Sequence, residues 1–174
     1  MLELLLYPIY FAVYLPIVLY PIPYINTKII KQRVFIDICE YRMATLLTTI
    51  TIYNYFNKSK FFSDDLFYIF VGNILICIGQ ILNLSVYFRL GRKGVYYGLQ
   101  YRTVQYRKLE NTFPFYISHP QYLGGILSYI GSYLLIAFDE GIFDPMLTVL
   151  LINIMIVQLY LVAMETTFDK IYKK

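Results

Sequence analysis

Charged residues are scarce in this chain of 174 residues. They make up 15% of it, whereas hydrophobic residues make up 59%. No polar segment is long enough to fold as a separate soluble domain. This composition excludes the ordinary classes of soluble protein and is typical of a membrane protein. We therefore expect an all-α integral membrane bundle of four to five spans, formed as a single domain over residues 1–174.

Cysteine and histidine are also rare. The chain has two cysteines, Cys39 and Cys77, in separate apolar contexts, and one histidine, His119. Without a CxxC spacing or a neighbouring histidine, the cysteines indicate neither a metal site nor a redox pair, so we expect no metal. They are expected to be small buried side chains.

Two motifs of nucleotide-binding proteins are missing as well. No G-x-G-x-x-G run follows a strand and no βα alternation is present, which excludes a Rossmann-type domain. The net charge of +4 is modest and lies mostly beside the apolar runs. This pattern favours contact with the headgroups of a lipid bilayer over contact with nucleic acid.

The apolar runs predict five membrane spans. The first run contains four prolines and lacks the basic start and cleavage site of a signal peptide, so we expect it to stay in the mature protein. It either spans with a bend or re-enters the same face. The predicted spans are residues 4–25, 43–57, 66–88, 122–138 and 146–164.

Basic residues are distributed unevenly between the connecting segments. Segments 26–42 and 89–121 are rich in Lys and Arg, whereas 139–145 carries only acidic charges. The positive-inside rule therefore places 26–42, 89–121 and the C-terminal tail in the cytosol, and 58–65 and 139–145 on the other side.

The last two spans are expected to form a helical hairpin. The turn between them is compact, and span four carries a face of small residues on which another helix can pack closely. These residues are Gly124, Ser128, Gly131 and Ser132. The hairpin would bring His119, before span four, and Glu165, after span five, to the same level of the membrane.

His119 directly precedes Pro120, and proline is well suited to the first position of a helix. His119 is therefore the expected helix cap, beside unpaired backbone N–H groups. Taken singly, His119 can be only a cap and Glu165 only a hydrated acid. Their predicted proximity is what indicates a site.

Three amides, Asn73, Gln80 and Asn83, share one arc of span three. Amides inside a membrane need hydrogen-bonding partners. We expect this arc to face protein or ligand rather than lipid, most simply as a contact between helices.

Several stretches, in this order, resemble the membrane phospholipid methyltransferases of the phosphatidylethanolamine N-methyltransferase type. They are "LGRKGVYYG", then "FPFYISHPQYLGGILSYIG", an acidic turn and "METTFDKIY", and the resemblance runs from about Tyr20 to Tyr172. The pair His119-Pro120 is also similar to the "RHPxYxG" motif of the isoprenylcysteine carboxyl methyltransferases, which share the architecture.

The resemblance implies a site for S-adenosylmethionine. In the family this cofactor lies between a Gly-x-Gly on the third span and a Glu-Glu pair after the last one. The first motif falls on Cys77-Ile78-Gly79 and keeps only its second glycine; the pair falls on Met164-Glu165 and keeps only its second acid. The implied cofactor residues are Cys77, Ile78, Gly79, His119, Pro120, Tyr122, Gly124, Met164 and Glu165.

The implied reaction is methylation of a phosphatidylethanolamine headgroup by a membrane-embedded methyltransferase domain. An amine with a pKa near that of lysine, about 10.4, must first lose a proton. His119 is the candidate base, and Glu165 the candidate partner of the cofactor's positive charge. The candidate residues for the lipid headgroup are Arg89, Arg92, Tyr97, Tyr101 and Arg102.

Three other functions remain open from the sequence. The chain could methylate a prenylcysteine carboxylate, act as an NADPH-dependent membrane sterol reductase, or be a degenerate interaction protein. Lipid methylation suggests a multi-pass protein of the endoplasmic reticulum membrane if the source is eukaryotic. The oligomeric state is left open.

Overall fold

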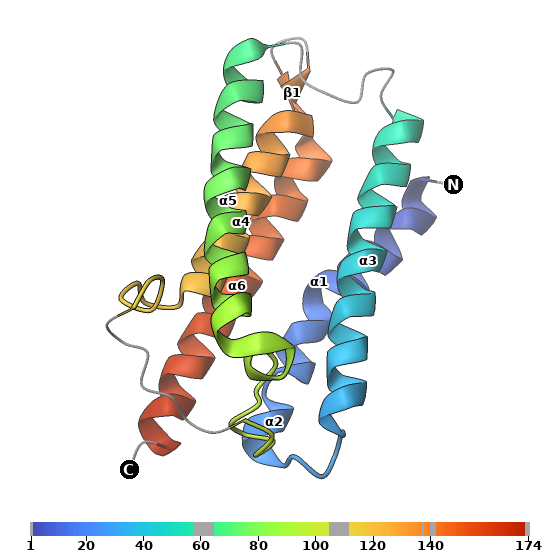
Figure 1. The fold of residues 1–174 in the computed structure, drawn as a ribbon. Helices are drawn as coiled ribbons and strands as arrows, with labels where there is room; N and C mark the ends of the chain where they lie inside the picture. Colours follow the sequence, from blue (N-terminus) through green and yellow to red (C-terminus); the bar gives the residue numbers. More distant parts are fainter. Residues whose placement is uncertain (1, 58–64, 105–111, 137, 140–141, 173–174) are drawn as a thin grey trace.

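The computed structural model describes residues 2–57, 65–104, 112–136, 138–139 and 142–172. These residues form a helical bundle, which confirms the predicted all-α class (Figure 1). Two-residue strands, β1 and β2, pair antiparallel in the turn between α5 and α6. The elements are α1 (Leu2–Leu19), α2 (Ile22–Ile25), α3 (Gln32–Asn57), α4 (Leu66–Val95), α5 (Pro120–Ile136), β1 (Phe138–Asp139), β2 (Ile142–Phe143) and α6 (Pro145–Tyr172).

Three long helices begin where the local chemistry favours a helix start. The Asp65 carboxylate accepts a hydrogen bond from the Phe67 N–H at 2.8 Å and caps α4. The Asp144 carboxylate accepts from the Leu147 N–H at 2.9 Å, and Pro145 follows as the first residue of α6. Pro120 begins α5, as predicted.

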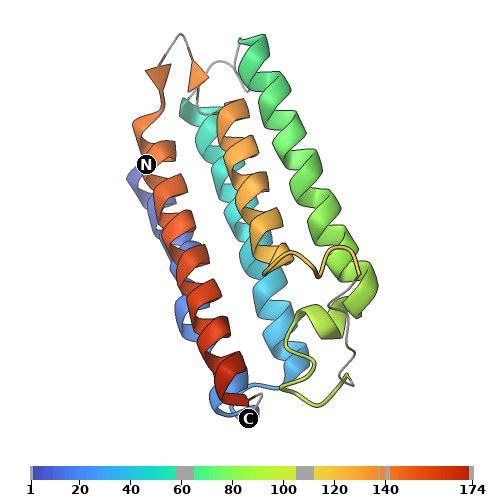
Figure 2. The same ribbon diagram turned by 90° about the vertical axis from the view of Figure 1, so that its left-hand side faces the viewer.

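Helix α5 lies between α4 and α6 (Figure 2). The predicted hairpin of α5 and α6 is present, but the small-residue face of α5 lies against α4. A Cβ atom on Gly79 would come within 2.5 Å of the Gly124 carbonyl oxygen, and one on Gly131 within 2.5 Å of the Gly72 carbonyl oxygen. Only glycine permits such a close approach of the two backbones.

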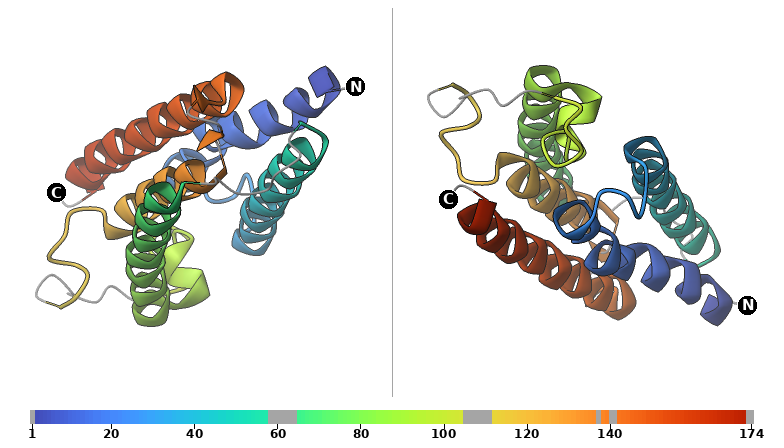
Figure 3. Two further views of the ribbon diagram at one scale, coloured as in Figure 1. Left: turned by 90° about the horizontal axis from the view of Figure 1, so that it is seen from above. Right: turned by 90° about the horizontal axis from the view of Figure 1, so that it is seen from below.

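The apolar core lies on the other side of the bundle, where α1 contacts both α3 and α6 (Figure 3). Its fully buried members include Ile9 of α1, Phe35 and Leu46 of α3, and Leu161 of α6. Cys39 is buried in this core as predicted, whereas Cys77 is exposed on α4.

Among the described residues, three segments are long and apolar enough to cross a membrane: Tyr7–Ile25, Leu66–Val95 and Leu147–Phe168. The long helices α3 and α5 run beside them. Helix α3 begins at Gln32, well before residue 43, where the second span is predicted to start, and it includes the whole of that span. Its charged residues Arg33, Asp37 and Glu40 are exposed along one face while Phe35 and Cys39 are buried on the other, so charge does not interrupt the helix.

The predicted environment of the amide arc is only partly correct. Asn73 and Gln80 are exposed on α4; the Asn73 amide donates to its own helix at the Ile69 carbonyl, and the Gln80 amide donates to the Ser128 hydroxyl at 2.9 Å. Asn83 is directed at α5 as well, where its Oδ1 atom lies in the contact with Gly124.

Candidate active site

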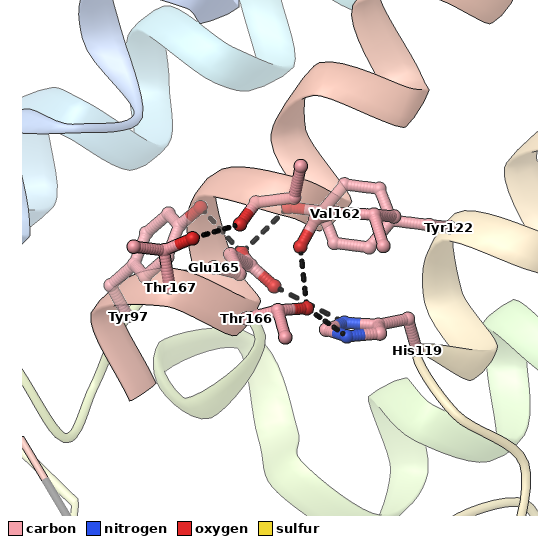
Figure 4. A network of polar contacts seen from close by, with 8 residues as sticks. Tyr97, His119, Tyr122, Val162, Glu165, Thr166 and Thr167 are labelled. Carbon is pink, nitrogen blue, oxygen red and sulfur yellow. Dashed lines mark hydrogen bonds and ion pairs between the residues drawn. The ribbon is translucent and has the colours of Figure 1, made fainter. Parts of the chain in front are cut away.

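Polar side chains from three segments converge on the Glu165 carboxylate at the end of the bundle where α4 ends and α5 begins (Figure 4). The Tyr97 and Tyr122 hydroxyls both donate to Oε1 of Glu165, at 2.7 and 2.6 Å. The second oxygen, Oε2, lies 3.8 Å from Nδ1 of His119. The two side chains that the hairpin was expected to bring together are therefore neighbours, and both are largely buried.

Glu165 lies within α6 and not beyond its end, because this helix continues to Tyr172. Its side chain is 19% exposed, and the two phenols supply charge-assisted hydrogen bonds to one of its oxygens. A carboxylate held in this way is a ready partner for a cation.

His119 adopts a left-handed backbone conformation with φ of +51° immediately before α5. Its carbonyl oxygen accepts a hydrogen bond from the Leu123 N–H, so it belongs to the first turn of the helix. Left-handed backbone is uncommon in residues other than glycine and is often found at functional sites. Here it directs the imidazole toward α6.

The hydrogen bonds of Thr166 determine which histidine nitrogen can exchange a proton. The Thr166 hydroxyl donates its single hydrogen to the Val162 carbonyl at 2.7 Å. It therefore accepts from Nε2 of His119, 3.0 Å away, and Nε2 must carry a hydrogen. Nδ1, the nitrogen that faces Glu165, is then the atom that gains or loses a proton.

Tyr97 also has a left-handed backbone, with φ of +58° just beyond α4. Its ring is packed among Tyr20, Tyr24 and Phe35, with centroid separations of 5.8, 5.4 and 5.6 Å. Burial and the nearby Tyr122 and Glu165 raise the pKa of Tyr97 well above its usual value, so the hydroxyl remains a donor at physiological pH.

Gln32, the first residue of α3, holds the segment that carries Tyr97. Its buried side-chain amide donates to the carbonyl oxygens of Lys93 and Tyr96, both at 2.9 Å. Its Oε1 atom accepts from the Thr103 hydroxyl at 2.6 Å. These bonds satisfy two carbonyls at the end of α4 and connect the segment on both sides of Tyr97.

The other residues expected to bind a cofactor lie in different surroundings. Cys77 and Ile78 are exposed on α4, and Gly79 is in contact with Gly124 and Ser128 of α5. Met164 is buried in the apolar core. Pro120 is buried at the start of α5.

The expected headgroup residues also differ in their contacts. Arg92 pairs with Glu40 at 2.7 Å and with Asp37 at 3.5 Å, which connects α4 to α3 and keeps the pKa of Glu40 below its usual range. Arg89 and Arg102 are exposed. Tyr101 is half-buried, and its hydroxyl has no hydrogen-bonding partner among the described residues. Arg107 and Lys108, part of the same basic segment, lie outside the described residues.

A sequence profile of the phospholipid methyltransferase family matches residues 67–174, more than half of the chain. The chain belongs to the phospholipid methyltransferase family. The matched region spans nearly all of α4, together with α5 and α6, and includes every residue that converges on Glu165. No curated protein and no solved structure is significantly similar to the chain.

Membership confirms the resemblance predicted from the motifs and indicates a phospholipid methyltransferase kind of function in a membrane. Two contributors to the site were missed from sequence. Thr166 adjoins Glu165, but nothing in the local pattern marks its hydroxyl. Gln32 lies far from the site in sequence, in the segment 26–42 that the sequence predicts to be a loop.

Proposed function

We propose that the chain transfers a methyl group from S-adenosylmethionine to the amine of a phosphatidylethanolamine-type lipid at the cytoplasmic face of the membrane. The observation that supports this most is the convergence of Tyr97, Tyr122 and His119 on one buried carboxylate, Glu165, in a member of this family. The proposal treats residues 1–174 as one domain, because α1 and α3 pack on α6 and on the Tyr97 segment.

The donor set around Glu165 fits the positively charged part of this cofactor. Oε2 of Glu165 has no phenol donor, whereas Oε1 has two, so Oε2 is the oxygen suited to an ammonium or sulfonium group. When bound, the cofactor supplies an electrophilic methyl group. The segment Cys77-Ile78-Gly79 of α4 does not fit the cofactor. Cys77 and Ile78 are exposed, and the space beside Gly79 is occupied by α5.

His119 would act as the base. An ethanolamine headgroup is largely protonated near neutral pH and cannot attack until it loses a proton. Nδ1 of His119 can take that proton, while Nε2 stays bonded to Thr166. The imidazolium formed would be stabilised by Glu165 at 3.8 Å, and orientation of the amine supplies the rest of the rate increase.

The lipid phosphate would be bound by exposed arginines of the same end. Arg89 and Arg102 are exposed, whereas Arg92 is already engaged with Glu40. Tyr97 is occupied with Glu165, and the Tyr101 hydroxyl is buried, so the arginines are the candidates for this role. In a eukaryotic cell the protein would be a multi-pass component of the endoplasmic reticulum membrane.

Membranes that contain the protein provide the test. They are incubated with S-adenosylmethionine carrying a labelled methyl group and, in separate samples, with phosphatidylethanolamine, farnesylcysteine or no added acceptor. We expect label in the phospholipid fraction only. Label in farnesylcysteine instead would identify a carboxyl methyltransferase, and label in neither would overturn the proposal.

A further inference from the structure

An apolar groove separates α1 from α3 on the part of the chain that precedes the family match. Its volume is about 670 Å³, within the range of about 300–1,000 Å³ found for ligand sites. Leu15 and Leu19 line it from α1, and Val34 and Ile38 from α3. Phe11 and Tyr41 at its sides are strongly exposed, so the groove is open to the outside of the bundle.

A cation without an acidic partner lies in this groove. Arg42 donates from Nη1 to the Ala12 carbonyl at 3.2 Å and from Nη2 to the Met43 sulfur at 3.0 Å. Its Nε is buried without a partner, and no carboxylate among the described residues forms an ion pair with it. Arg92, the other well-placed arginine, has two such partners.

This arrangement is costly unless an anion completes it. The guanidinium is permanently charged and has five N–H donors, and the Met43 sulfur is a poor acceptor for them. A charged side chain that lies against apolar surface without a counter-charge is unfavourable, and a bound anion would supply that charge. The groove therefore calls for a ligand with an anionic group and an apolar chain.

The position of Arg42 along α3 identifies the ligand more closely. Arg42 is the last charged residue before the uncharged stretch 43–57, so it lies where the charged part of the helix meets its apolar part. The phosphate of a phospholipid lies at the same kind of boundary, between the polar headgroup and the acyl chains. Asp37, which also lines the groove, already pairs with Arg92 at 3.5 Å.

We infer that the groove between α1 and α3 binds a phospholipid, with its phosphate at Arg42 and an acyl chain against Leu15 and Ile38. This site is separate from Glu165 and does not require that the chain be a methyltransferase. It places a lipid-binding function in the helices that the family profile does not cover.

Photolabelling tests the inference without the cofactor, so its result is independent of methyl transfer. Membranes containing the protein receive phosphatidylethanolamine with a diazirine in one acyl chain, and labelled peptides are mapped by mass spectrometry. Label on residues 11–19 and 34–45 is expressed relative to label on the exposed face of α4, which includes Phe70 and Ile74 and reports ordinary bilayer lipid.

We expect this ratio to fall about tenfold in Arg42→Gln and to stay unchanged in Arg33→Gln, which removes an exposed arginine from the same helix. Leu15→Trp, which fills the groove, should lower it similarly. With the wild-type protein, a diacylglycerol that carries the same diazirine chain but no phosphate should label the groove about tenfold less. Equal labelling by the two lipids would overturn the inference, as would an equal loss in the two arginine variants.

Discussion

Two clusters of carboxylate and cation lie toward the same end of the bundle, and they differ in what surrounds them. Arg92 meets Glu40 and Asp37 in the open, with side chains 44–58% exposed. Glu165 meets His119 in a largely buried setting, where two phenols bond the same carboxylate oxygen. An exposed pair is worth about 0–1 kcal/mol, whereas a buried charge without its partners is strongly unfavourable.

The difference in solvent exposure indicates which of the two clusters is suited to a role in chemistry. Both clusters contain residues that sequence reasoning assigned to the site, but the Arg92 cluster only connects α4 to α3. The Glu165 cluster combines a buried charge, a proton-exchanging nitrogen and two left-handed backbone positions. Changes in the Glu165 cluster are therefore expected to lower activity, and changes in the Arg92 cluster to leave it nearly unchanged.

The largest effect is expected for Glu165→Gln. The amide keeps an oxygen for Tyr97 and Tyr122 but removes the negative charge, so kcat/KM for lipid methylation should fall about 100-fold or more. The matched control is Glu40→Gln, which removes the exposed carboxylate and should leave kcat/KM within about twofold. Equal losses in the two variants would mean that burial does not distinguish the clusters.

His119→Asn should follow with a loss of about 100-fold at neutral pH. Asparagine tolerates left-handed backbone, so the turn before α5 is preserved while the titrating nitrogen is lost. The loss should appear in kcat more than in KM, measured over a range of lipid concentrations. An Asn variant as active as the wild type would remove His119 as the base.

Removal of one phenol donor should cost less. Tyr122→Phe and Tyr97→Phe each delete one hydrogen bond to a charged group, worth about 1.5–3 kcal/mol, so kcat/KM should fall about 10- to 100-fold. Tyr116→Phe, at an exposed tyrosine, serves as the control. Undiminished activity in both site variants would show that the two hydrogen bonds do not support catalysis.

Arg92→Gln should have the smallest effect. Because its ion pairs are exposed, thermal stability in detergent should fall only slightly, and by less still at high salt. Thermal unfolding monitored by circular dichroism measures this. A large loss of thermal stability would place the Arg92 cluster among the determinants of the fold.

How much of the fold and of the site could be predicted from the sequence depends on how far apart in the chain the interacting residues lie. The hairpin and the approach of His119 to Glu165 follow from span order and helix rise, so they could be predicted. The contact of Tyr97 with Glu165 depends on the left-handed backbone of Tyr97 after α4, and no local sequence pattern predicts that conformation. Helix α3 begins inside the charged segment 26–42, which the sequence predicts to connect two spans; Arg33, Asp37 and Glu40 share one exposed face, so their charges are compatible with a helix.

The same reasoning applies to the cofactor motif. The resemblance implies that Gly79 lines a cofactor site, and in the structure this glycine also allows the backbone of α5 to approach α4 closely. The tight contact of α4 with α5 is a property of two helices together. A single sequence does not reveal which of its glycines serves packing and which serves a ligand.

The most direct measurement is a double-mutant cycle between His119 and Glu165, with kcat/KM for methylation of phosphatidylethanolamine as the readout. If imidazole and carboxylate act as one unit, Glu165→Gln combined with His119→Asn should be little worse than the more damaging single variant. If the two losses instead multiply in full, the residues act independently, and the account of a shared buried site is contradicted.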